Sequence, residues 1–447
     1  MGSRLTPLGA LLLPGMLLAG PLTAQPRHDE AGSGVRSSSA LVPAVLVSPD
    51  KTKLLLMERT APSNGADAGS TYSALIVQPI GRGEIRRMIL PWKARVRSVV
   101  WAPDGNRVAF TILEETGTSL WVGDAYSGVI RMLAGPVLLG GGDDGCQWFH
   151  SGEKILCQRI PAGGSAGSTA GQLVVYSVSG SDRPIGRPAR YGKVATSPDG
   201  KYLTVETVEG PLELWDASDG TVLRVLRDRN VVVRSASSDA VPSGPRSFEW
   251  RGDKPSTLVW VEAQDGGNPA QAAPVRDRLF QLASPFTGAP EPFAALEFRS
   301  RGIVWSGEDL AVVSEGWSQP QRQRSWIVRP DRGGAPRLLG PAKGNFITRQ
   351  KSGGGDVLLT SGEGRMAYLR GQGAEPSGGP FLDQIDLTTG KVLRLWRSPA
   401  AFNEEVVAVL DADGGRFITR RESATEPPNY YIRDLKKKDL TPLTRFK

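Results

Sequence analysis

Residues Trp101-Ala102-Pro103-Asp104-Gly105 lie between two apolar stretches of the chain. Proline presets φ at the first turn position, aspartate hydrogen-bonds its own backbone, and glycine accepts a positive φ. The pattern therefore predicts a tight turn that joins two β-strands, with a tryptophan at the end of the first strand.

The same turn pattern returns along the chain. Clear copies lie at 46–50, 148–152 and 196–200, and weaker copies at 250–253, 305–308, 351–353 and 411–414. A second signal, a short strand closed by a polar turn, follows each of these turns. Its clearest copies are 120–124, 212–216 and 384–390. The two signals alternate with a mean spacing of about 52 residues, which is typical of a repeat architecture.

Each repeat has room for about four short strands and shows no helical periodicity. Four antiparallel strands per repeat of this length predict an all-β fold, a β-propeller of four-stranded antiparallel blades that spans residues 41–447. We expect eight blades, with seven as the alternative, and a tryptophan before each turn that packs between neighbouring blades. A pair of β-sandwiches is the other all-β solution, but it would not explain the regular period.

The composition excludes several classes of protein. Hydrophobic residues make up 39% of the 447 residues, enough to bury a core, and the formal net charge is +8. A disordered chain, a coiled coil and a polytopic membrane protein do not fit these values. Two cysteines and two histidines supply too few ligands for a zinc or haem site, so we expect no metal and no cofactor. No basic stripe indicates nucleic-acid binding.

The first 24 residues have the features of a secretory signal peptide. Arg4 is followed by an apolar stretch and by the small-residue site Leu22-Thr23-Ala24. The stretch is short and interrupted by Pro14, although an uncleaved membrane anchor is the alternative interpretation. We expect cleavage after residue 24, a flexible lead-in over residues 25–40, no membrane span in the mature chain, and a periplasmic or secreted protein.

Several longer motifs carry a resemblance to a known family. They lie at 260–267 (Trp-Val-Glu-Ala-Gln-Asp-Gly-Gly), 276–277, 285–286, 380–383, 419–423 and 428–435. With the repeated turns, they make the chain resemble the N-terminal propeller of the prolyl oligopeptidase (S9) family of serine peptidases, in its glutamyl endopeptidase branch. The resemblance implies a propeller that restricts peptide access to an α/β-hydrolase domain, which carries the Ser, Asp and His of the triad. We expect that domain to begin near Lys447, so it is missing from this chain or separately encoded.

The chain by itself does not meet the requirements of a serine hydrolase. One G-x-S-x-G match exists, centred on Ser165 in a Gly/Ala/Ser-rich run. In such enzymes the triad histidine follows the serine in the chain, whereas His28 and His150 both precede Ser165. We therefore expect no catalytic residue here, and a chain that is inactive alone.

The last repeat contains the charged residues considered for a role in gating. Arg420 and Arg421 precede Glu422, and successive strand residues face opposite sides, so at most one arginine faces the channel. That arginine could bind an acidic side chain of a substrate. The alternative is an Arg–Glu pair that ties the last blade to its neighbour. The acidic pair Glu404-Glu405 is interpreted as part of a solvated loop.

The two cysteines flank the third turn. If Ser151 and Gly152 are the loop residues, Trp148 faces Ile155 and Cys146 faces Cys157 across the hairpin. Directly opposed residues lie close enough for a disulfide, and a secreted location permits one. Two buried free thiols are the alternative, because directly opposed disulfides are uncommon.

Two functions remain open. The first is the propeller part of a secreted S9 peptidase, truncated or split from its hydrolase, with an apolar patch where the two parts meet. The second is a stand-alone periplasmic propeller that binds a protein or peptide. A sugar-dependent or metal-dependent propeller enzyme lacks a supporting set of residues.

Overall fold

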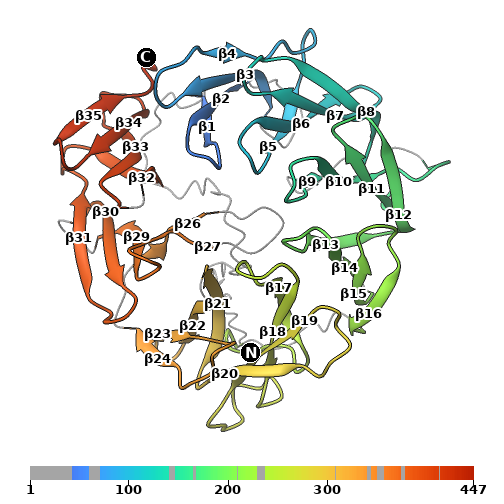
Figure 1. The fold of residues 1–447 in the computed structure, drawn as a ribbon, viewed down its shortest axis with the longest axis vertical. Helices are drawn as coiled ribbons and strands as arrows, with labels where there is room; N and C mark the ends of the chain where they lie inside the picture. The colour runs from blue at the N-terminus through green and yellow to red at the C-terminus, as the bar shows by residue number, and fades with distance from the viewer. Residues whose placement is uncertain are drawn as a thin grey trace, which may run out of the picture.

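A ring of antiparallel β-sheets surrounds a central axis in the computed structural model of the protein (Figure 1). The structure describes residues 43–59, 71–139, 146–164, 168–208, 210–228, 237–307, 309–339, 344–349, 357–373, 378–411 and 413–447. These residues form strands, turns and loops and no helix. The predicted all-β propeller is confirmed, whereas residues 1–24 and 25–40 lie outside the described part.

The first half of the chain forms units of four strands each. They are β1 (Ala44–Val47), β2 (Lys53–Arg59), β3 (Tyr72–Pro79) and β4 (Arg86–Arg87); β5 (Val96–Trp101), β6 (Arg107–Glu114), β7 (Gly117–Asp124) and β8 (Ile130–Leu138); β9 (Cys146–Trp148), β10 (Lys154–Arg159), β11 (Gly171–Ser177) and β12 (Asp182–Ala189); and β13 (Tyr191–Thr196), β14 (Tyr202–Thr207), β15 (Leu212–Asp216) and β16 (Val222–Arg227). Single residue pairs, Tyr72 with Val96 and Leu138 with Arg159, join the first three units into one continuous sheet.

The second half repeats this plan with one irregular unit. Its strands are β17 (Arg246–Trp250), β18 (Thr257–Ala263), β19 (Asp277–Ala283) and β20 (Glu291–Leu296); β21 (Arg299–Ser306), β22 (Leu310–Trp317), β23 (Arg322–Val328) and β24 (Arg337–Leu339); β25 (Asn345–Phe346), β26 (Thr348–Arg349), β27 (Val357–Leu358), β28 (Thr360–Ser361), β29 (Met366–Gln372), β30 (Pro380–Asp386) and β31 (Val392–Arg397); and β32 (Asn403–Val409), β33 (Arg416–Glu422), β34 (Asn429–Asp434) and β35 (Asp439–Pro442). Because β27 pairs with β21 of the preceding unit, β25–β31 divide between two sheets. The number of blades therefore stays a prediction.

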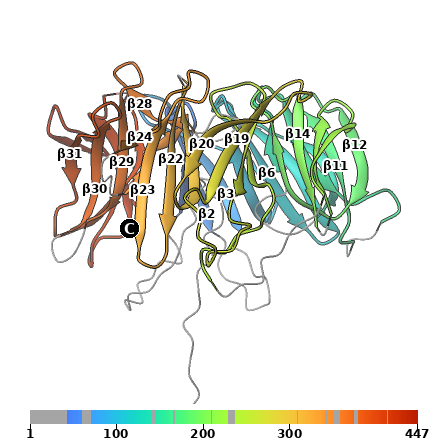
Figure 2. The same ribbon diagram turned by 90° about the horizontal axis from the view of Figure 1, so that it is seen from below.

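The order of strands gives the ring two distinct faces. In each regular unit the first strand lies nearest the axis and the fourth lies at the rim (Figure 1). Because the strands alternate in direction, β1 begins and β35 ends on the same face, which we call the terminal face. The C-terminus is marked in Figure 2. Connections between units and loops between second and third strands also lie there. The remaining loops lie on the opposite, far face.

The predicted tryptophan contacts between neighbouring units are confirmed. Trp148 Nε1 donates a hydrogen bond of 3.2 Å to the Val100 carbonyl of the preceding unit. Trp250 Nε1 donates one of the same length to the Ala195 carbonyl. Both tryptophans are buried, so each indole combines apolar burial with a polar anchor to the sheet before it.

The repeated turns owe their shape to the predicted side chains. In one copy, Ser197 Oγ donates to Asp199 Oδ1 at 2.7 Å and accepts the Tyr202 amide at 3.0 Å. Asp199 Oδ1 also accepts the Lys201 amide at 3.1 Å. Gly200 has φ = 69°, a conformation that glycine adopts readily. Local sequence therefore determines the turn that positions each first strand.

The hairpin of β9 and β10 follows the predicted register. Trp148 lies opposite Ile155, and Cys146 opposite Cys157. The two cysteines form a disulfide, with their Cα atoms 4.3 Å apart. This bond links the short inner strand β9 covalently to β10.

Apolar packing closes the ring. Leu54 and Leu56 of the first sheet share a buried cluster with Ile418 and Tyr430 of the last sheet. The Gln78 side chain also donates a hydrogen bond to the Leu443 carbonyl across this junction. Among the described strands, no pairing joins β32–β35 to β1–β4. In the described part of the chain, the first and last sheets are therefore joined through side-chain contacts.

Candidate functional site

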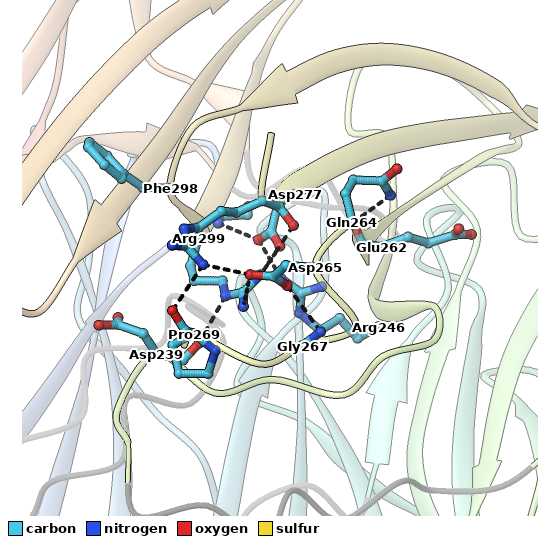
Figure 3. A network of polar contacts seen from close by, with 12 residues as sticks. Asp239, Arg246, Glu262, Gln264, Asp265, Gly267, Pro269, Asp277, Phe298 and Arg299 are labelled. Atoms are coloured by element: carbon cyan, nitrogen blue, oxygen red, sulfur yellow. Dashed lines mark hydrogen bonds and ion pairs between the residues drawn. The ribbon is translucent and has the colours of Figure 1, made fainter. Parts of the chain in front are cut away.

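Arg299, at the start of β21, is the centre of a buried charged network at the terminal face (Figure 3). Its guanidinium donates to Asp265 Oδ2 at 2.8 Å and to Asp277 Oδ1 at 3.0 Å. It also donates to the backbone carbonyls of Asp239, at 2.9 Å, and Arg276, at 3.1 Å. Arg299 is 1% exposed and both aspartates are 0% exposed, so the network is closed to solvent.

Two more arginines bind the two aspartates. Arg276 Nη1 donates to Asp265 Oδ2 at 2.8 Å, and Arg246, at the start of β17, donates to Asp277. The Ser300 amide donates to Asp277 Oδ2 at 2.7 Å. Each buried carboxylate thus has two guanidinium partners, as a buried charge requires if it is to remain ionised.

These contacts determine the protonation state of Asp265. Burial alone would raise the pKa of its carboxyl group, but hydrogen bonds from Arg299 and Arg276 outweigh that effect and lower the pKa below its ordinary value of 3.8. Asp265 is therefore ionised at neutral pH, and it binds both arginines as a carboxylate.

The loop between β18 and β19 is bound to this network through Gly267. The Gly267 amide donates to Asp265 Oδ1 at 3.0 Å, and the Gly267 carbonyl accepts the Val241 amide at 3.1 Å. Gly267 has φ = 79°, and a Cβ atom there would lie 2.0 Å from the Val241 carbonyl oxygen. Only glycine fits this close approach, so Asp265-Gly266-Gly267 is a structural unit.

The network holds segments of the backbone in place. It contains no free group that could react. Its carboxylates are inaccessible, and its arginines hold the loop at 264–276 and the first residues of β17 and β21. The guanidinium of Arg276 also lies 4.2 Å from the centre of the Trp317 ring. We interpret the network as a rigid support for the terminal face, next to the axis of the ring.

The predicted gating residues lie on β33, the second strand of the last sheet. Arg420 donates to both carboxylate oxygens of Glu422 in its own strand, at 3.1 and 2.9 Å. Arg421 lies 3.5 Å from the centre of the Phe402 ring and 3.6 Å from a carboxylate oxygen of Glu426. The expected pair that ties the last blade to its neighbour is therefore wrong, because these contacts stay within one sheet and its loops. A role in gating stays a prediction.

The interpretation of Glu404 as a solvated residue is also wrong. Glu404 is 0% exposed, and Arg433 binds its two carboxylate oxygens at 2.6 Å each. Thr419 Oγ1 donates to the same carboxylate at 2.7 Å. Glu405 is exposed. Glu404 is therefore a buried structural residue, and Glu405 is a surface residue.

Sequence reasoning missed the buried network as a site. The residues at 265–267 and 276–277 served only to carry the family resemblance, and Arg246 and Arg299 were not singled out. The sequence signal that could have found it was an Asp-Gly-Gly loop together with arginines at the first positions of β17 and β21, which are the first strands of two consecutive units.

The catalytic alternatives have no support in the described part. His150 is exposed on the turn between β9 and β10, and Ser165 and His28 lie outside the described residues. Among those residues, no group of three or more His, Cys, Asp and Glu side chains could hold a metal ion. In the same part of the chain, no helix is long and apolar enough to cross a membrane.

Comparison with curated proteins yields two relatives. The probable chloroplastic glutamyl endopeptidase of Oryza sativa subsp. japonica is 29% identical over 442 residues, which cover 80% of this chain and 47% of that protein. The corresponding protein of Arabidopsis thaliana is 28% identical over 517 residues, which cover 91% of this chain and 54% of that protein. The chain is similar to glutamyl endopeptidases. The resemblance expected from its motifs is confirmed, and the chain spans about half the length of these glutamyl endopeptidases.

Comparisons with solved structures and with family profiles give less information than the two curated relatives. A prolyl endopeptidase structure is 13% identical with a TM-score of 0.49, covering 86% of this chain and 55% of that chain. The β-propeller domain of the Trilobed protease from Pyrococcus furiosus is 11% identical with a TM-score of 0.44, covering 79% of this chain and 99% of that chain. No protein-family profile matches the sequence.

Proposed function

We propose that this chain is the propeller part of a secreted serine peptidase of the prolyl oligopeptidase family. It gates the access of peptides to an α/β-hydrolase domain and has no peptidase activity alone. The observation that carries the proposal is the similarity to two glutamyl endopeptidases that are about twice as long as the matched region.

The physical basis of the proposed gating is a rigid ring with a well-supported terminal face. Buried ion pairs at Arg299 support the terminal face, and side-chain packing closes the ring. A rigid annulus admits extended peptides and unfolded chain ends, and it excludes folded proteins by size. The proposed catalytic partner lies on the terminal face, where β35 ends.

An exposed apolar loop on that face favours a docked partner. Ile89 and Trp92, in the connection between β4 and β5, are 81% and 89% exposed. Large exposed apolar side chains within one connection are typical of an interaction surface. The proposed hydrolase domain covers these two residues, and its removal leaves them in water.

The first test is to capture the native protein from its source with an antibody against the propeller, then label it with a fluorophosphonate that reacts with serine hydrolases. We expect the label on a band much heavier than this 47.8 kDa chain, or on a co-captured hydrolase. A native band at the size of the chain, with no labelled companion, would contradict the proposal and favour a stand-alone periplasmic propeller. Edman sequencing of the same band tests signal cleavage after residue 24.

Gating has its own test with the captured peptidase. A cleavable peptide is supplied free, and also inserted in a surface loop of a stably folded carrier protein. We expect cleavage of the free peptide only. Equal rates for both substrates would contradict gating while leaving the family assignment intact.

A further inference from the structure

The far face contains a hollow between two neighbouring units of the ring. It has a volume of about 330 Å³ and lies where β21–β24 meet the unit of β25–β31. This volume is in the range of small-molecule sites. The lining residues come from both units: Ser306, Leu310, Ile327, Arg329, Arg337, Glu363, Gly364, Arg365, Leu387 and Thr388.

Positive charge predominates in the lining. Three arginines and one glutamate are among the lining residues, and Asp386, which pairs with Arg365, adds a second carboxylate next to them. Two of the arginines are held in place from the neighbouring strand ends: Arg337 donates to the Leu387 carbonyl, and Arg365 donates through Nε and Nη2 to Asp386 Oδ2, at 3.0 and 2.6 Å. These contacts use only part of the five N–H donors of each guanidinium.

The lining also includes apolar side chains that are themselves buried. Leu310, Ile327 and Leu387 are buried at 6%, 6% and 2% exposure, and each lines the cavity. A ligand that fills the hollow therefore contacts both apolar side chains and guanidinium groups. This combination suits a small molecule with an apolar body and a single anionic group.

We propose that this hollow is a binding site for a small organic carboxylate. The carboxylate accepts hydrogen bonds from Arg337 and Arg365, and the apolar part of the ligand packs on Leu310 and Ile327. The hollow lies on the far face, opposite the terminal face, and its test uses this chain alone, so the test does not depend on the proposed peptidase function.

The test uses isothermal titration of this chain with N-acetyl-leucine, its uncharged analogue N-acetyl-leucinamide, and inorganic phosphate. We expect N-acetyl-leucine to bind and the amide to bind at least about tenfold more weakly, the effect of losing one charge-assisted hydrogen bond. Equal binding of the acid and the amide, or no binding of the acid, would overturn the proposal. Binding of phosphate as tight as that of the acid would overturn the role of the apolar lining residues.

Two variants locate the binding. Arg337→Gln and Arg365→Gln should each weaken binding of N-acetyl-leucine by roughly 10- to 100-fold. Arg416→Gln is the matched control, because its side chain is exposed on the last sheet, away from the hollow. Circular dichroism melting checks that each variant is folded. If both folded variants bind as the control does, the proposed site is wrong.

Discussion

Replacement of Arg299 with alanine should destabilise the protein by about 3–5 kcal/mol, the usual cost of breaking a buried ion pair. Arg299 makes two hydrogen bonds to carboxylates and two to backbone carbonyls. Hydrogen bonds to a charged group contribute about 1.5–3 kcal/mol each, and all four of these bonds involve the charged guanidinium. Arg276 and Arg246 remain as partners for the aspartates, which brings the expected loss below the sum of these contributions.

Urea unfolding, followed by tryptophan fluorescence, measures this loss. Arg416→Ala is the control: its side chain is 51% exposed and lies 4.0 Å from Asp434, so we expect less than about 0.5 kcal/mol. Asp265→Asn combined with Arg299→Ala should recover part of the loss, because it removes a buried charge that has lost a partner. The reasoning is refuted if Arg299→Ala costs no more than the control.

Four further predictions follow from the same contacts. The lowered pKa of Asp265 stabilises the folded protein above the carboxyl's ordinary pKa of 3.8, and this stabilisation is lost as the pH falls through the lowered folded value. Asp265→Asn should remove this pH-dependent stability. An acid unfolding curve identical to that of the parent would contradict this. Burial raises the pKa of Tyr191 to about 12, so stability that is present below pH 10 should be lost as the pH rises towards 12, and Tyr191→Phe should flatten that part of the urea-stability profile. Replacing Cys146 and Cys157 with alanine should cost about 2–3 kcal/mol, because the disulfide closes a short loop with a sequence separation of 11; unchanged melting would argue against this bond in solution. Trp92→Ser should leave the melting temperature of the chain unchanged and weaken binding of the proposed hydrolase about tenfold or more by surface plasmon resonance, since the indole is 89% exposed.

Local patterns predicted the fold because its repeated turns are local structures. Pro198, Asp199 and Gly200 determine their turn within a few residues. The β9–β10 register followed from the same local reasoning, as the pairing of Trp148 with Ile155 shows.

The buried charges required information that the sequence pattern does not contain. Arg299 and Asp265 are 34 residues apart, and Glu404 and Arg433 are 29 apart. Charged residues occur throughout the surface, so a distant pair of opposite charges is not distinctive until the sheets bring it together. This is why Glu404 was assigned to solvent and why the network at Arg299 was missed.

The way in which the ring closes has a consequence for the timing of synthesis. The hydrogen bond between Gln78 and Leu443 spans 365 residues. At about 5–20 residues per second, a ribosome needs roughly 20–70 s to make the chain between them. During that interval the apolar edge of the first sheet, including Leu54 and Leu56, has no partner from the last sheet. We expect the nascent chain to depend on chaperone binding there, and to lose that dependence once the last sheet emerges.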